Sequence, residues 1–136
     1  MRKYQKPIAE VISTTSEGVY ASSGSSSEVG AHIGTPKVKS QADLNFICIW
    51  FPIEEDNYAS DKIPHMRVVF DKPVGDVAVH TEDMPYLHGG VSVSGNGTNT
   101  ITFNFSDRSI IGYDFNITVH AQSGSVAPSI ISSTIY

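Results

Sequence analysis

From Asp43 onward, apolar side chains recur at every second position in several short runs. The clearest run covers residues 113–120, in which four apolar residues alternate with four polar ones. A period of two residues is typical of a β-strand that turns one face to a core and the other to water. No segment shows a sustained helical stripe. The pattern therefore predicts a protein built from strands.

Turn signals divide the chain into about seven strands. A Pro-containing turn covers residues 71–75, and Gly95-Asn96-Gly97 supplies the positive φ angles of a tight hairpin. The predicted strands are 44–51, 66–70, 76–81, 91–94, 100–105, 113–120 and 130–136. Short strands at this spacing predict an all-β fold, namely an antiparallel β-sandwich that is immunoglobulin-like or jelly-roll-like.

The most apolar run, Leu44 to Phe51, carries hydrophobic residues on both faces. Such a run predicts a central strand that is covered on both sides. Cys48 lies within it, so its thiol is expected to behave as a small buried hydrophobe. Trp50 lies on the same apolar run and is expected in the core.

The sandwich is predicted for residues 43–136, and residues 1–42 are predicted to be a flexible, leader-like linker with at most a short strand. Residues 13–27 are rich in Ser, Thr and Gly and offer little to bury. Residues 7–12 or 17–22 are the segments with strand character. If one of them added to the sheet edge of a neighbouring copy, the chain would form a homo-oligomer.

Two resemblances follow from these residues. The opening Met-x-x-Tyr-x-x-Pro-x-x-Glu-Val, with the later Gly-Val-Tyr-Ala-Ser-Ser-Gly, resembles leader-like N termini of small proteins from anaerobic Gram-positive bacteria. The run 66–74, with segments 91–95, 101–103 and 116–120, resembles bacterial immunoglobulin-like modules over about half the chain. That second resemblance implies a surface or scaffold role and brings no catalytic residues.

Composition narrows the range of partners. The formal net charge is -5, and the nine Lys and Arg residues are scattered, which disfavours nucleic acid. No apolar run is long enough for a membrane helix, and no ordinary signal peptide is visible. A single cysteine excludes an intrachain disulfide. Export to the cell surface or the extracellular space is the expected localisation, by a route that the sequence does not identify.

Catalytic and metal chemistry have weak support. No Gly-x-Ser-x-Gly, phosphate loop or His-Glu-x-x-His is present. A small metal-dependent enzyme remains an alternative because of five histidines, with His80 and His120 able to meet if their strands are neighbours. The acidic loop, Glu54 to Asn57 with Asp61, offers oxygen ligands for Ca²⁺ but lacks EF-hand spacing. We therefore expect no resident cofactor.

Aromatic residues in polar loops are the better candidates for function. Sugar rings or peptide side chains rest on exposed aromatic faces, and neighbouring polar groups bind hydroxyls. Trp50 and Tyr113 fall on apolar faces and are expected in the core. The predicted ligand-binding residues are Tyr58, Tyr86, Asp56, Asn57, Glu82 and His88. The predicted function is a non-enzymatic surface module that binds a glycan or a protein through its loops; the alternatives are the strand-adding structural subunit and the metal-dependent enzyme.

Overall fold

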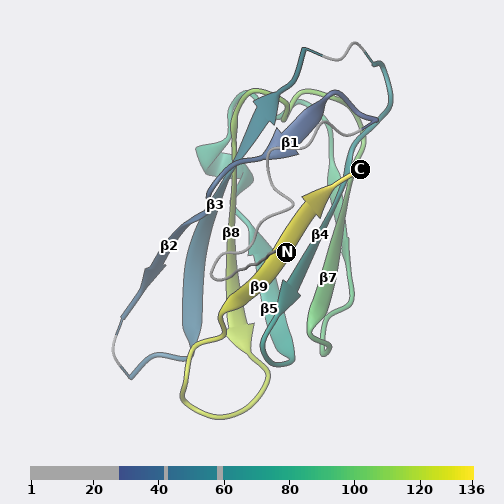
Figure 1. Cartoon of the computed structure of the whole chain (residues 1–136). Helices are drawn as coiled ribbons and strands as arrows, with labels where there is room; N and C mark the ends of the chain where they lie inside the picture. Colours follow the sequence, from purple (N-terminus) through teal and green to yellow (C-terminus); the bar gives the residue numbers. More distant parts are fainter. Residues whose placement is uncertain (1–27, 42, 58–59) are drawn as a thin grey trace, which may run out of the picture.

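The computed structural model describes residues 28–41, 43–57 and 60–136, which fold into an antiparallel β-sandwich (Figure 1). The strands are β1 (Ala31–Ile33), β2 (Lys37–Ser40), β3 (Phe46–Glu55), β4 (His65–Phe70), β5 (Val74–Val79), β6 (Val91–Ser94), β7 (Thr100–Phe105), β8 (Asp114–Ala121) and β9 (Ile130–Ile135). A single short 3-10 helix, η3 (Thr81–Asp83), is the only helix among the described residues. The predicted all-β sandwich is confirmed, including all seven strands expected after residue 43.

The nine described strands fall into two sheets. One sheet has the order β1-β3-β8-β5, with β2 also paired to β3, and the other has the order β6-β7-β4-β9. The β6–β7 hairpin is confirmed at the Asn-Gly turn, and around it β5 pairs with β8 and β4 pairs with β9. Every pairing is antiparallel. This nested pairing brings residues that are far apart in sequence to the same end of the molecule.

The core lies between the sheets and is filled by residues at alternate strand positions. In β7 and β8 the predicted inward residues are buried, including Ile101, Phe103 and Phe115. Phe115 meets the rings of Phe103 and Phe105 edge to face, with both pairs of ring centroids 5.0 Å apart. Edge-to-face packing is a favoured arrangement of aromatic pairs. These three rings form the centre of the core.

The expectation that β3 is covered on both faces is wrong. Its buried residues alternate strictly with partly exposed ones, so only one face packs in the core. Trp50 and Cys48 lie on the outer face and are both partly exposed, which corrects the prediction that they are core residues. The sequence was misleading because the outer positions of β3 carry Phe46, Cys48, Trp50 and Pro52, which are as apolar as the inner ones.

The described sheet begins before the domain boundary predicted at residue 43. β1 pairs with the end of β3, and β2 pairs with its beginning. Ala31 and Ile33 are buried in the core, whereas all of β2 is exposed. The strand and leader predictions for residues 7–12, 13–27 and 17–22 lie outside the described residues. Within the described part of the chain, no helix has the length and apolarity needed to cross a membrane.

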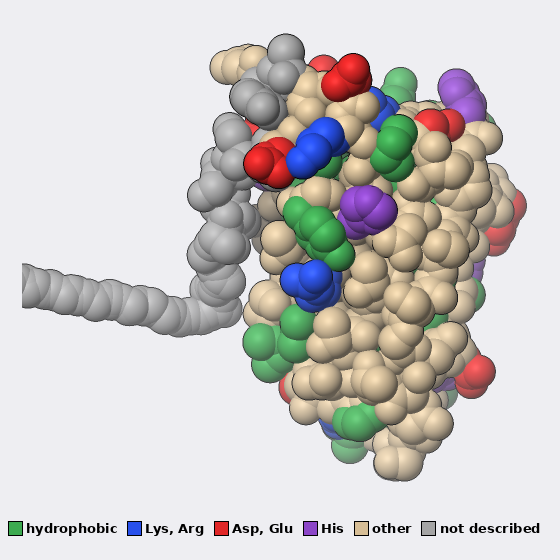
Figure 2. Space-filling model, turned by 90° about the vertical axis from the view of Figure 1, so that its right-hand side faces the viewer, with side chains coloured by type: hydrophobic (Ala, Val, Ile, Leu, Met, Phe, Trp, Pro, Cys, Tyr) green, Lys and Arg blue, Asp and Glu red, His purple; other side chains and the backbone are tan. Residues whose placement is uncertain are grey.

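The outer face of the β6-β7-β4-β9 sheet is made mainly of uncharged polar residues. Figure 2 looks toward the side on which β4 and β7 lie and shows a mainly tan surface on which charged and hydrophobic side chains are scattered. The outward residues of β6 are Ser92 and Ser94, and those of β7 are Thr100, Thr102 and Asn104. His65 joins them by a hydrogen bond between its ring and Asn104, 2.6 Å long.

Candidate functional site

Three loops and β1 gather at one end of the sandwich, at the top of Figure 1. Because β3, β5 and β7 all run toward this end, the loops that follow them lie there together. Their described residues are 56–57 with 60–64, then 80–90, and 106–113. They contain the predicted ligand-binding residues that the structure describes, namely Tyr86, Asp56, Asn57, Glu82 and His88. We call this end the loop end.

Two tyrosines stack at the loop end. Tyr86 comes from the loop after β5, and Tyr113 directly precedes β8. Their ring centroids are 4.3 Å apart and their planes differ by 11°. The Tyr86 hydroxyl donates a hydrogen bond to the backbone carbonyl of Asp114, which fixes the Tyr86 ring. Tyr113 is 51% exposed, so it is not the core residue that the alternating pattern predicted.

The surroundings of Tyr86 are acidic. Burial raises the pKa of the Tyr86 phenol, and the nearby carboxylates of Asp114 and Asp83 raise it further. Both effects disfavour the phenolate, the first by removing water and the second by charge repulsion. An aromatic surface flanked by carboxylates suits a ligand that presents hydroxyl donors or a positive charge.

The raised pKa of Tyr86 predicts a late-ionising tyrosine. The folded protein should hold this phenolic proton above the ordinary tyrosine pKa of about 10. The unfolded chain would release it there, so the free energy of unfolding should fall as the pH rises beyond that value. Ultraviolet absorbance of phenolate, measured against pH, checks this. Tyr86→Phe should remove the late component, and ionisation of every tyrosine in the ordinary range would contradict the prediction.

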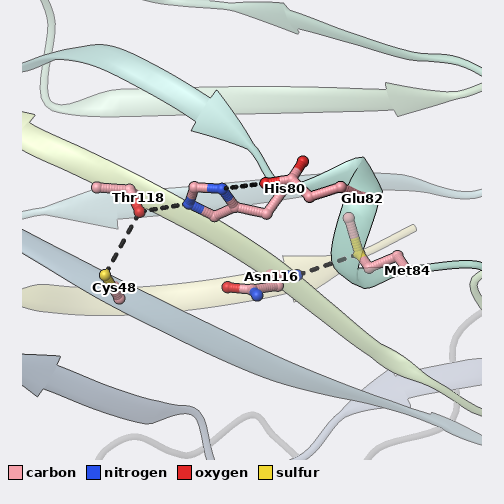
Figure 3. A network of polar contacts seen from close by, with 6 residues as sticks. All are labelled: Cys48, His80, Glu82, Met84, Asn116 and Thr118. Carbon is pink, nitrogen blue, oxygen red and sulfur yellow. Dashed lines mark hydrogen bonds and ion pairs between the residues drawn. The ribbon is translucent and has the colours of Figure 1, made fainter.

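A chain of hydrogen-bonded side chains crosses the outer face of the β1-β3-β8-β5 sheet, next to the loop end (Figure 3). The Nε2 atom of His80 lies 2.6 Å from Oγ1 of Thr118, and Nδ1 lies 3.4 Å from a carboxylate oxygen of Glu82. Cys48 extends the chain, with Sγ 3.4 Å from the same Thr118 hydroxyl. The chain ties β3, β8 and the residues after β5 together on the outer face. Through His80 it also contacts Glu82, which belongs to the loop end.

The same region holds the metal-ligand candidates. His80, Glu82 and Asp83 bring ligand atoms within 4.8 Å of one another, the one such group among the described residues, and both carboxylates are exposed. The strands of His80 and His120 are neighbours, as the metal hypothesis required. The register, however, places His120 opposite Gly75, so the predicted cross-strand pair with His80 does not form.

Met84 and Asn116 form a further contact near this chain of hydrogen bonds (Figure 3). Met84 is buried, and its sulfur accepts a hydrogen bond from the backbone N–H of Asn116 at 3.4 Å. β5 has ended at this point, and the N–H of His80 makes the last backbone hydrogen bond to β8, at the carbonyl of Asn116. The Met84 sulfur then takes the place of a β5 residue as the partner of the Asn116 N–H. Met84 thereby anchors the loop that carries Tyr86.

The acidic residues at the end of β3 and directly after it have a different role. Asp56 bonds the Nδ1 atom of His32 on β1 at 2.5 Å, and Glu54 bonds its Nε2 atom at 2.8 Å. The Asp56 side chain is only 9% exposed. Because the imidazole occupies one oxygen of each carboxylate, the predicted acidic loop binds the protein's own histidine. Sequence analysis missed His32, which lies ahead of the predicted domain.

Arg108 connects two further segments of the loop end. One nitrogen of its guanidinium donates to the carbonyls of Val29 and Lys62, at 2.9 and 2.7 Å. The backbone N–H of His88 donates to the Ser109 hydroxyl at 2.9 Å, which joins the loops after β5 and β7. Ser109 bonds Asp107 through its hydroxyl and its N–H, and these bonds lower the pKa of that carboxyl. The loops therefore hold one another in place.

The structure places the predicted ligand-binding residues unevenly. Glu82 and His88 are exposed in the same loop as Tyr86. Asn57 is exposed beyond β3, Asp56 is held by His32, and Tyr58 lies outside the described residues. The predicted meeting of Tyr58 and Tyr86 is therefore not tested. Tyr113 is the stacking partner that sequence analysis rejected, and its one signal was its position directly after Gly112.

Together these observations define a two-sheet, antiparallel β-sandwich with a loop end that is aromatic and acidic. Comparison with known proteins gives no more specific assignment, since no family model, curated protein or solved structure matches this chain. The predicted likeness to immunoglobulin-like modules stays a prediction.

Proposed function

We propose that this protein is a non-enzymatic, surface-displayed β-sandwich module that binds glycans through its loop end. The observation that carries the proposal is the stacked pair of Tyr86 and Tyr113, in which Tyr113 is half exposed. A flat aromatic pair in which one ring is already fixed offers a rigid apolar surface to a sugar ring. Binding there requires little rearrangement of side chains.

Carboxylates around the pair supply the polar part of such a site. Glu82, Asp83 and Asp114 are exposed, and carboxylates accept hydrogen bonds from ligand hydroxyls. Sites for small ligands combine an apolar surface with a few polar groups that fix orientation. Negative charge also disfavours acidic sugars. The preferred ligand is therefore a neutral glycan.

A glycan array probed with the full chain tests the proposal, followed by calorimetry with the best neutral oligosaccharide. We expect Tyr113→Ala to weaken binding at least tenfold, because it removes the exposed ring. Tyr113→Trp should keep binding, because it restores an aromatic surface. Tyr136→Ala is a matched control, since Tyr136 is 41% exposed but stacks on His65 of the other sheet.

Three outcomes would overturn glycan binding at this site, two of them from glycan binding itself. One is an array without any bound neutral glycan at millimolar ligand. The other is glycan binding that Tyr113→Ala and Tyr136→Ala weaken equally. Binding confined to lysine-rich peptides would point to a protein partner held by the same carboxylates and would also reject the glycan.

A further inference from the structure

The edges of the two sheets differ in how well they are protected. A free edge exposes backbone N–H and C=O groups to pairing by another chain, and proteins block it with charges, bulges or short strands. β2 carries Lys37 and Lys39 and is fully exposed. β5 has a break in register between Gly75 and Ala78, and β6 is only four residues long. Three edges are therefore blocked in a recognisable way.

The fourth edge, β9, lacks these protections along most of its length. Its sequence is Ile-Ile-Ser-Ser-Thr-Ile, without charge, proline or glycine. Among the described residues it pairs with β4 alone. A break in register between Val69 and Phe70 affects only its beginning. β9 is thus the one edge strand of the described sheets whose composition favours further pairing.

The hydrogen bonds to β4 show which backbone groups of β9 point outward. Tyr136 and His65 exchange both of their backbone hydrogen bonds, at 2.7 and 2.8 Å. In an antiparallel ladder such pairs alternate with residues that point their N–H and C=O groups away from the partner. Ser133 and Ile135 therefore face the outer edge. Near Ile135 this edge is close to β1, so the accessible part that pairs regularly with β4 is the middle of the strand, around Ser133.

An apolar side chain is exposed on β9 itself. Ile131 is 58% exposed. Added strands bind by main-chain hydrogen bonds and gain specificity from side-chain contacts of this kind.

The chain itself contains a segment that suits this edge. Residues 7–12, Pro-Ile-Ala-Glu-Val-Ile, are rich in β-branched residues and lack glycine. Fifteen residues separate Ile12 from Glu28, where the described chain begins, and they span up to about 50 Å when extended. Arg2, Lys3 and Lys6 precede the segment, whereas residues 28–136 contain twelve acidic and six basic residues. This reach is sufficient for contact with another copy, and the opposite charges favour such a contact.

We infer that residues 7–12 of one molecule add as a strand to the outer edge of β9 in a second copy. The donor segment and the acceptor edge are different surfaces of the same chain. A contact of this kind is heterologous, so it produces open chains of subunits or closed rings. The assembly does not use the loop end and is independent of glycan binding.

Sedimentation velocity of the full chain over a concentration series tests the inference. We expect dimers and larger species. Val11→Lys should weaken association at least tenfold, because it places a charge within the added strand. Thr15→Lys is the matched control, with the same charge outside residues 7–12, and should associate like the unchanged protein. Ser133→Pro should also weaken association, because it removes an outward N–H from the acceptor edge.

A monomer at every concentration would overturn the inference, including the case in which the segment pairs within its own chain. So would oligomers that Val11→Lys leaves intact. If Ser133→Pro proves unfolded by circular dichroism, Val11→Lys and Thr15→Lys still decide the question. Glycan binding by the monomeric Val11→Lys variant would separate this result from the proposed function.

Discussion

Phe115→Ala is expected to lower the free energy of unfolding by about 3–5 kcal/mol, the usual range for removing a buried phenylalanine. Phe115 is fully buried and meets Phe103 and Phe105 edge to face, so its loss opens a cavity at the centre of the core. The rings around that cavity belong to β7 in the opposite sheet and cannot collapse without moving the strand. The cost therefore includes both lost burial and a persistent void.

Chemical denaturation followed by the fluorescence of Trp50, the chain's single tryptophan, measures the change. Phe46→Ala is the matched control, because Phe46 lies partly exposed on the outer face of β3. We expect that control to cost about 1 kcal/mol, in proportion to the smaller area that it buries. Equal losses from the two variants would show that Phe115 does not occupy the core.

Gly95→Ala is expected to destabilise the protein by about 3 kcal/mol or more, since it combines backbone strain with a steric collision. Gly95 has a φ of +98°, where an L-residue is strained by about 1–2 kcal/mol. A Cβ atom at this position would lie 2.1 Å from the carbonyl oxygen of Thr100. Backbone, and not a flexible side chain, would have to move. The β6–β7 hairpin and its bond from Gly97 to Val74 would shift with it.

Gly97→Ala separates strain from collision in this turn. Gly97 also has a positive φ, +87°, but a Cβ atom there would meet nothing within 4 Å. This variant should therefore cost only the backbone strain. Thermal unfolding followed by circular dichroism compares the two variants. A Gly95→Ala protein as stable as Gly97→Ala would contradict the close approach of Thr100.

The strands could be predicted from the sequence because the residues that form the core of a sandwich alternate with polar ones within each strand. Residues 101–105 show this period of two, and the Asn-Gly turn marks where the chain reverses direction. The same rule failed for β3. Its outer residues, Cys48 and Trp50 among them, are apolar, yet no second layer of the described residues covers them. The burial of β3 therefore alternates although its chemistry does not.

The candidate site was harder to predict because it depends on contacts between distant segments. Tyr86 was predicted as a site residue because it lies in a polar loop. Its stacking partner Tyr113 is the first residue of the alternating run 113–120, and it is exposed because β8 begins one residue later, at Asp114. His32 captures Asp56 from 24 positions away. Nothing in the local pattern of residues 54–57 indicates that contact. Strand order decides it, since β1 pairs with the last residues of β3.

The double contact of Arg108 bears on how strongly the loop end can bind. One guanidinium nitrogen spans the carbonyls of Val29 and Lys62, so the backbone beside the third loop is already immobilised before any ligand arrives. Ordering a mobile loop on binding costs conformational entropy, which subtracts from affinity. Here that entropy is lost during folding. If the proposed glycan binding is correct, the ligand would meet a preorganised surface, and selectivity among sugars would come from shape rather than from induced closure.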